Sequence, residues 1–378
     1  MSNLLKQRII DRITAEGPIS FEDFMEMALY YPDLGYYSRE STEIGRHGDF
    51  YTSPHLHQIF GVMMSRQIFE MWRIMEKPSF QIVEMGAGEG YLARDMLDYL
   101  SKTKSEGLRE FFKNLSYTII EINPSFKKRQ QGLLYGFLDK VNWANAIEEV
   151  DTLTGCLLSN ELLDSFPIRL IEMNDDLYEI YIAIDGDGNL IEIKRPCGED
   201  IKAYLEEFNV KLPSGYRTEI NLRIKDWLIK VSEKFSEGFI LTIDYGYPAC
   251  DYYSESRNRG TLLCYHGHRI EEDPFKYIGE QDITAHVNFS SLKKWGEEVG
   301  LKTIGYCEQG PFLVSLGVDE IIKELYGEVP DPVGVSKIKG LIMPEGMGES
   351  HKVMIQYKGR RDIKELKGFG LRNRLRWL

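Results

Sequence analysis

The segment Glu84-Met85-Gly86-Ala87-Gly88-Glu89-Gly90 decides the predicted fold, because it lies between a short strand and a helix. The residues before it, 81–85, form an apolar run that is typical of a buried strand. Apolar residues then repeat at helical spacing over 91–100. A glycine loop in this position lets a ligand approach the backbone closely, so it favours a nucleotide-like ligand.

The spacing of the glycines distinguishes between nucleotide-like ligands. A dinucleotide fingerprint, G-x-G-x-x-G, would have its third glycine at position 91, where this chain has Tyr91. No Lys-Ser or Lys-Thr pair follows the loop, which excludes a nucleoside-triphosphate P-loop. An acidic residue followed by glycines at alternate positions is instead associated with S-adenosylmethionine. We therefore expect that cofactor to be bound by Glu84, Gly86, Ala87, Gly88 and Gly90.

The rest of the chain predicts an α/β fold, a Rossmann-like and mostly parallel sheet with helices on both faces. Apolar strands are expected at 117–122, 155–159, 239–243, 301–306, 311–316 and 353–357. Three β-like runs separated by turn residues over 168–195 indicate an antiparallel insertion, placed at about 168–235. Residues 1–78 are expected to form an N-terminal helical cap and 79–378 the main domain. A surface helix is expected in the basic tail, 364–378.

Carboxylates follow two of the predicted strands. Glu121 ends the strand after the glycine loop, where a carboxylate can accept hydrogen bonds from both ribose hydroxyls of the cofactor. Glu161 and Asp164 follow the strand at 155–159, and one helical turn would place both on the same side. Such a pair suits a guanidinium, which stays protonated in proteins. The alternative is a helix N-terminus that carries stabilising acids.

Seven motifs along nearly the whole chain resemble the MidA-like family, which includes the mitochondrial complex I assembly-factor arginine methyltransferase. They are Gly48-Asp49-Phe50-Tyr51-Thr52-Ser53-Pro54, the glycine loop, residues 159–164 (SNELLD), 215–220 (GYRTEI), 243–247 (IDYGY), 259–265 (RGTLLCY) and 282–289 (DITAHVNF). The resemblance implies a class I methyltransferase fold and the methylation of arginine on a partner protein. It also implies a respiratory-complex subunit as the partner.

Beside the resemblance, four further residues belong to the candidate site. We expect Asn160, Asp49 and Thr52 to contact the cofactor, the last two from an N-terminal segment that acts as a lid. We expect His286 to orient the acceptor or relay a proton, and a hydrogen-bonded structural histidine is the alternative. The predicted catalytic residues are therefore Glu161, Asp164 and His286. Residue types alone leave lysine, a carboxylate or a small molecule open as the acceptor.

Composition excludes several other classes of protein. The net charge is −13, which disfavours nucleic-acid binding, and no apolar run approaches the roughly 18 residues of a membrane span. The five cysteines form no CxxC pair, so we expect neither a disulfide framework nor a metal. The N-terminus has neither a secretory nor a transit composition, so we expect a cytoplasmic protein. The rival hypothesis is a catalytically weak assembly chaperone that binds a partner through the same fold. A dinucleotide oxidoreductase is disfavoured by Tyr91.

Overall fold

The computed structural model describes residues 2–40, 52–327 and 331–378, which form two compact units. The first unit comprises Met1–Phe50, Leu163–Asp226 and Tyr247–Leu292, and the second comprises Tyr51–Leu162, Trp227–Gly246 and Lys293–Leu378. No boundary between the units falls near residue 78: helix α4 (Ile59–Met75), which we placed in the N-terminal cap, belongs to the second unit.

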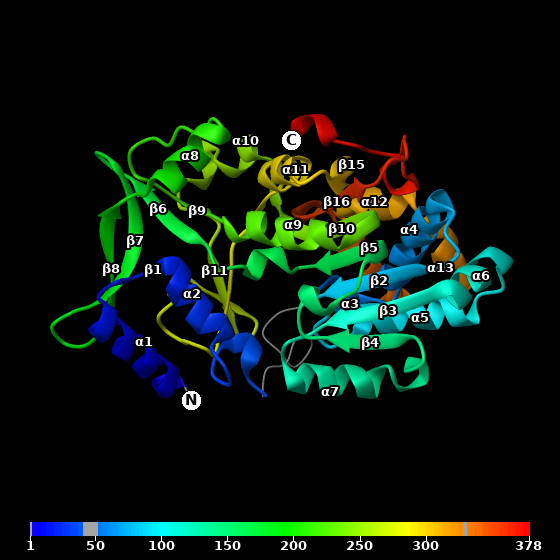
Figure 1. Cartoon of the computed structure of the whole chain (residues 1–378), viewed down its shortest axis with the longest axis horizontal. Helices are drawn as coiled ribbons and strands as arrows, with labels where there is room; N and C mark the ends of the chain where they lie inside the picture. Colours follow the sequence, from blue (N-terminus) through cyan, green and yellow to red (C-terminus); the bar gives the residue numbers. More distant parts are fainter. Residues whose placement is uncertain (1, 41–51, 328–330) are drawn as a thin grey trace. The chain divides into compact units, whose positions relative to one another are not determined.

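The second unit is built around a mixed sheet that confirms the predicted α/β fold (Figure 1). Its strands are β2 (Phe80–Met85), β3 (Leu115–Ile120), β4 (Val141–Ala144), β5 (Leu153–Asn160), β10 (Phe235–Tyr247), β15 (Lys302–Glu308) and β16 (His351–Lys358). The spatial order is β15-β16-β10-β5-β2-β3-β4, and β16 runs in the direction opposite to the other six of these strands. The chain proceeds outward from β2 in one direction and from β5 in the other. Ligands of open α/β sheets bind outside the carboxyl ends of the strands at such a switch point.

Helices cover this sheet and complete the second unit. Helix α4 packs against β5 and against α5 (Tyr91–Lys102), and its buried residues lie around most of its circumference. The other helices of this part of the chain are α3 (Ser53–Leu56), α6 (Glu106–Asn114), α7 (Pro124–Leu133), α9 (Arg223–Lys234), α11 (Phe289–Glu298), α12 (Gln309–Ser315), α13 (Val318–Tyr326), α14 (Pro332–Ile342) and α15 (Met347–Ser350). Short 3-10 turns lie at Tyr135–Phe137, Ile147–Glu149, Lys367–Phe369 and Leu375–Trp377.

Two predictions near the C-terminus are wrong. The apolar run 311–316 is not a strand but most of helix α12, in which Phe312 and Leu313 are buried. A short apolar run does not distinguish a strand from a buried helix, and Pro311 is tolerated because it lies in the first helical turn. The basic tail forms two 3-10 turns in place of a surface helix.

The first unit is an antiparallel structure made from the insertion and the N-terminal segment together. Its strands are β1 (Ile19–Ser20), β6 (Arg169–Met173), β7 (Leu177–Ile184), β8 (Leu190–Pro196) and β9 (Tyr216–Ile220) in one sheet, β11 (Leu263–His266), β12 (Arg269–Glu271) and β13 (Asp282–Thr284) in another, and the short β14 (Val287–Asn288). Its helices are α1 (Ser2–Glu16), α2 (Phe21–Tyr30), α8 (Glu199–Glu207) and α10 (Ala249–Tyr252), with 3-10 turns at Tyr36–Ser38, Leu163–Ser165 and Glu255–Arg257. Because β1 pairs with β7, the N-terminal segment is part of the insertion's sheet.

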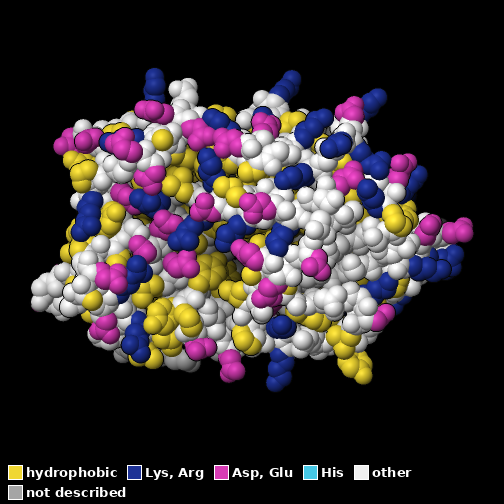
Figure 2. Space-filling model, viewed as in Figure 1, with side chains coloured by type: hydrophobic (Ala, Val, Ile, Leu, Met, Phe, Trp, Pro, Cys, Tyr) yellow, Lys and Arg dark blue, Asp and Glu magenta, His cyan; other side chains and the backbone are white. Residues whose placement is uncertain are grey.

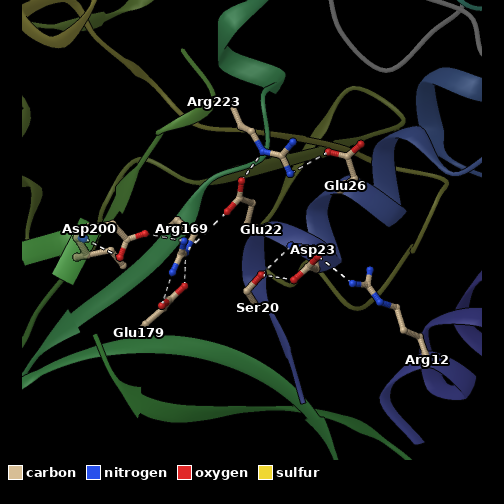
Figure 3. Close-up of polar contacts among 10 residues, drawn as sticks. Arg12, Ser20, Glu22, Asp23, Glu26, Arg169, Glu179, Asp200 and Arg223 are labelled. Atoms are coloured by element: carbon tan, nitrogen blue, oxygen red, sulfur yellow. Dashed lines mark hydrogen bonds and ion pairs between the residues drawn. The ribbon is translucent and has the colours of Figure 1, made fainter. Parts of the chain in front are cut away.

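Ion pairs attach the N-terminal helices to this sheet (Figure 3). Arg169 on β6 forms a forked contact with Glu179 on β7, and it also reaches Asp200 at 3.2 Å and Glu22 of α2 at 3.7 Å. Arg223 contacts the same Glu22. Glu179 is buried, so the guanidinium of Arg169 is what neutralises its charge inside the fold.

Two further observations concern the surface charge and the length and apolarity of the helices in the described part of the chain. On the face shown in Figure 2, acidic and basic side chains are interspersed, so that face carries no large region of one sign. None of the helices within residues 2–40, 52–327 and 331–378 is both long enough and apolar enough to cross a membrane.

Candidate functional site

The glycine loop leaves β2 at the switch point of the second unit's sheet. Gly86, Gly88 and Gly90 have φ values of 73°, 53° and 86°, which side chains other than glycine rarely adopt. A Cβ on Gly86 would lie 3.0 Å from Leu162 Cδ1, and one on Gly90 would lie 3.2 Å from Gln130 Cγ. The loop therefore needs glycine for its conformation and for the space around it, and Gly86 at its start is exposed.

Glu84 lies under this loop, inside the sheet. Its side chain is buried, and Tyr117 on β3 donates a hydrogen bond to Oε2 at 2.7 Å. Burial raises the pKa of Glu84 to about 7, although the hydrogen bond from Tyr117 acts in the opposite direction. The structure thus gives Glu84 a supporting position beneath the loop, and its contact with the cofactor stays a prediction.

We expect Glu84 to make stability depend on pH. The folded pKa is raised above the ordinary value of 4.5, so its contribution to the free energy of unfolding is fully present below pH 4.5 and is lost as the pH rises through about 7. Relative to Glu84→Gln, the wild type should lose on the order of 2 kcal/mol between pH 5 and pH 8. Urea unfolding of both proteins at the two pH values measures this difference. Glu110→Gln, at an exposed site on α6, is the control. The expectation would be contradicted if the free energy of unfolding changed by the same amount between pH 5 and pH 8 in the wild type and in Glu84→Gln.

Glu121 stands at the carboxyl end of β3, beside the loop, as the sequence predicts. Its Oε1 accepts a hydrogen bond from Asn123 N at 2.8 Å, and its Oε2 accepts one from Gln130 Nε2 at 3.0 Å. Burial raises the pKa of Glu121, whereas these hydrogen bonds lower it. The carboxylate is therefore fixed in place next to the glycine loop.

Gln130 on α7 is a site residue that the sequence analysis missed. It is fully buried, and its Nε2 also donates to Gly88 O at 2.8 Å, while Trp143 Nε1 donates to its Oε1 at 2.9 Å. One amide thus links the glycine loop, Glu121 and β4. No local sequence pattern identifies it, because its three partners come from separate strands and loops.

Replacing Gln130 by Leu should weaken cofactor binding about tenfold, because Gly88 O and Glu121 lose a shared donor whose loss costs about 1–3 kcal/mol. Calorimetric titration with S-adenosylmethionine measures the change. Gln131→Leu is a matched control, because the neighbouring amide is exposed. Equal affinity in both variants would show that the amide does not shape the loop.

Thr52 is connected to the glycine loop through one histidine. Thr52 Oγ1 lies 2.6 Å from His55 Nδ1, and the His55 ring packs edge-on against Tyr91, the first residue of α5. Asp49, the other lid residue predicted from the sequence, lies outside the described residues. The lid function of this segment stays a prediction.

Glu161 directly follows β5 and has an unusual backbone conformation, with φ at 51°. Its N–H donates to Ile243 O of β10 at 2.8 Å, which holds the residue in this left-handed region. Three groups lie around its side-chain Oε1, namely Ser53 N at 3.3 Å, Asn160 Nδ2 at 3.3 Å and His351 Nε2 at 3.4 Å. Among the described residues, no hydrogen bond is formed to the other oxygen, Oε2.

Asn160, immediately before Glu161, carries a second available oxygen. Its side chain is buried, and its Oδ1 has no hydrogen-bond partner within the described part of the chain. Buried polar atoms are usually paired, so an unpaired one at a strand end points to a missing ligand. The open glycine loop, the carboxylate of Glu121 and this amide oxygen together suit a ligand with hydroxyl and amine groups, as S-adenosylmethionine has.

Asp164 and His286 lie in the first unit, whereas Glu161 lies in the second. The helical turn that would pair Glu161 with Asp164 is absent: Glu161 is left-handed, and a 3-10 turn begins only at Leu163. Asp164 is buried, and its carbonyl accepts a hydrogen bond from Ala285 N at 2.9 Å. The backbone N–H of His286 donates to Thr261 Oγ1 at 3.0 Å, and its ring lies against Tyr247.

Comparison with known proteins gives one family and one set of relatives. The family model described as "Putative S-adenosyl-L-methionine-dependent methyltransferase" matches residues 63–307. The protein arginine methyltransferase NDUFAF7 homolog, mitochondrial, of Drosophila melanogaster is 27% identical over 94% of this chain and 85% of that protein. The mouse protein arginine methyltransferase NDUFAF7, mitochondrial, is 25% identical over 91% of this chain and 82% of that protein.

A solved structure extends the comparison to the whole fold. The crystal structure of a superfamily member from Burkholderia thailandensis, with S-adenosyl-homocysteine bound, matches with a TM-score of 0.89. It is 30% identical, and the match covers 100% of this chain and 97% of that chain. The relatives also correct one expectation: the cytoplasmic location predicted from the sequence is wrong by this comparison, because the fly and mouse relatives are mitochondrial proteins.

Proposed function

The chain belongs to the MidA-like family of S-adenosyl-L-methionine-dependent methyltransferases, and from this premise we propose that it methylates arginine side chains of a partner protein. The observation that carries the choice of arginine is Glu161, a carboxylate at the sheet's switch point whose side chain is 7% exposed and whose Oε2 accepts no hydrogen bond within the described residues. The names of the relatives support the same acceptor. A carboxylate matches the guanidinium in charge and in hydrogen-bonding geometry.

We assign cofactor binding to residues at the carboxyl ends of β2, β3 and β5. Bound S-adenosylmethionine supplies a methyl group on a positively charged sulfur. The backbone of the glycine loop, Gly86 to Gly90, leaves room for it, and Glu121 accepts hydrogen bonds from the ribose hydroxyls. Asn160 Oδ1 and Thr52 supply further polar contacts. These residues orient the cofactor and exclude water from it.

Glu161 Oε2 holds the acceptor guanidinium in this proposal. Methyl transfer to a guanidinium nitrogen forms one carbon–nitrogen bond, breaks the carbon–sulfur bond and releases one proton from that nitrogen. The carboxylate of Glu161 can accept that proton. Its main contribution is positioning, since aligning the reacting atoms supplies up to roughly 7–11 kcal/mol in well-oriented reactions. For Asp164 and His286, contact with the acceptor stays a prediction.

We also propose that the partner protein is a subunit of a respiratory complex. The support is the resemblance of the chain's motifs to the complex I assembly factor.

Radiolabelled methyl transfer into a lysate tests the proposed acceptor. The lysate comes from cells that lack the protein, so that the acceptor arginine is unmodified, and it is incubated with the purified chain and labelled S-adenosylmethionine. Acid hydrolysis should release the label as methylarginine from one or a few protein bands. Label in methyllysine, in carboxyl esters or in small molecules would contradict the arginine proposal.

A further inference from the structure

His351, the first residue of β16, lies beside Glu161 without completing a hydrogen bond. Its side chain is 8% exposed, and Nε2 is 3.4 Å from Glu161 Oε1, which is within ion-pair distance. Nε2 nevertheless forms no hydrogen bond within the described residues, because the contact is too poorly aligned to count as one. The other ring nitrogen, Nδ1, is 3.0 Å from Ser350 Oγ. A buried imidazole nitrogen left unpaired next to a carboxylate requires an explanation.

We propose that His351 is a positioning residue that controls the charge and the orientation of Glu161, so that a proton on His351 and the acceptor guanidinium compete for this carboxylate. The inference rests on the proposed arginine acceptor. Ser350 Oγ is 3.0 Å from Nδ1 and 3.4 Å from Gly346 O. In this proposal its one hydroxyl hydrogen goes to Nδ1, the shorter contact, and the ring carries its own hydrogen on Nε2, facing Glu161. Contacts of this kind are often long in a free enzyme and tighten in the substrate complex.

The arrangement around Oε1 explains why the other oxygen stays available. Ser53 N, Asn160 Nδ2 and His351 Nε2 come from α3, β5 and β16, and all three face the same oxygen. Ser53 is itself fixed, because its hydroxyl donates to Gln309 Oε1 at 3.1 Å. Two hydrogen bonds, from Ser53 N on α3 and from Asn160 Nδ2 on β5, fix the carboxylate plane, with His351 Nε2 beside the same oxygen. This leaves Oε2 as the oxygen that an incoming guanidinium can reach.

The other charged groups near His351 are already engaged. On β10, Tyr245 lies opposite His351, its ring 5.5 Å from the imidazole, and the Asp244 carboxylate accepts from Tyr245 N. Lys352 directs its Nζ to the carbonyl of Glu349. Glu308 on β15 is the strand partner of Lys352 on β16. Its carboxylate forms ion pairs with Arg374 at 2.8 Å and Arg372 at 3.4 Å. Among the described residues, Glu161 is the carboxylate within ion-pair distance of His351.

Competition for one carboxylate has a thermodynamic consequence. A proton added to His351 gives the imidazole a positive charge, and this charge neutralises Glu161. A neutral pair attracts a guanidinium less than a free carboxylate does, so protonation and arginine binding oppose each other. Arginine should therefore bind more weakly at pH 6 than at pH 8, and the difference should depend on residue 351.

The first test needs neither cofactor nor acceptor. Nitrogen-15 spectra of the histidine rings at pH 8, assigned with His351→Gln, identify which nitrogen of His351 carries the hydrogen. We expect the Nε2–H form, and a shift of this signal in Glu161→Gln. An Nδ1–H form, or a signal that is the same in Glu161→Gln, overturns the proposal.

The second test measures KM for the peptide around the arginine that is labelled in the lysate, at pH 6 and pH 8. In the wild type, KM should rise about tenfold on lowering the pH, whereas in His351→Gln, which keeps a donor but cannot become charged, it should change less than twofold. His57→Gln is the matched control, because both ring nitrogens of His57 already have partners. An equal rise in His351→Gln overturns the proposal. Absence of arginine methylation in the wild type defeats the proposed function instead, and the spectra then decide on His351 alone.

Discussion

Gly86→Val should lose at least a hundredfold in affinity for S-adenosylmethionine while the protein remains folded. At a φ of 73°, a β-branched side chain is strained by roughly 1–3 kcal/mol, and its Cβ would lie 3.0 Å from Leu162 Cδ1. The loop can relieve both only by moving away from the position that leaves its backbone open to the ligand. Because a tenfold change in affinity corresponds to about 1.4 kcal/mol, a distortion of a few kcal/mol is enough.

Calorimetric titration measures this affinity, and thermal unfolding of the same sample shows whether the fold persists. Gly136→Val is the matched control: it changes an exposed glycine of the same unit whose added Cβ would meet nothing within 4 Å. Unchanged affinity in Gly86→Val would remove the glycine loop from the cofactor site. If Gly86→Val unfolds, the affinity of Gly86→Ala is measured instead, because alanine keeps the backbone strain but lacks the branched side chain.

Glu161→Gln should reduce kcat for arginine methylation at least a hundredfold, with little change in cofactor affinity. The substitution keeps the shape and an acceptor for Ser53 N, but it removes the charge that faces the guanidinium. Loss of one well-placed electrostatic group in an active site typically costs about 100- to 1,000-fold in rate. The cofactor should still bind, because its proposed contacts lie on β2, β3 and Asn160.

Single-turnover kinetics separate the chemical step from product release in this variant. The substrate is the peptide around the arginine that is labelled in the lysate. Glu161→Asp provides a graded comparison, since it keeps the charge and withdraws it by one methylene. Glu106→Gln, at an exposed position at the start of α6, is the control for a change of net charge. Full activity in Glu161→Gln would refute the role of this carboxylate and would leave the acceptor assignment without its structural support.

The glycine loop and its strand were predictable from the sequence because their physical requirements are local. Left-handed turns need glycine, and a buried parallel strand needs a continuous apolar run. Glu121 was equally accessible, since the end of the neighbouring strand lies near the loop in any open α/β sheet. The helix at 311–316 could not be predicted in this way, because a short apolar run is compatible with a buried helix as well as with a strand.

The surroundings of Glu161 were hidden from the sequence for a different reason. The expected helical turn from Glu161 to Asp164 follows from spacing alone, whereas the observed left-handed backbone depends on the hydrogen bond that Glu161 N–H donates to Ile243 O of β10. His351 and Ser53 are 190 and 108 residues away along the chain, and they lie at the carboxylate because the sheet order and α3 bring them there. Only contacts between distant segments could show that Glu161 keeps one oxygen available.

By itself, the sequence determined the α/β class and the cofactor, and it predicted the end of the sheet at which the cofactor binds. These depend on local conformational freedom, strand hydrophobicity and glycine spacing, which are properties of short segments. The tertiary structure alone decided the division into two units, the link from Gln130 to the loop and Glu121, and the setting of Glu161. Each of these depends on which distant residues share a buried space, and that is fixed by packing and by the pairing of buried polar groups.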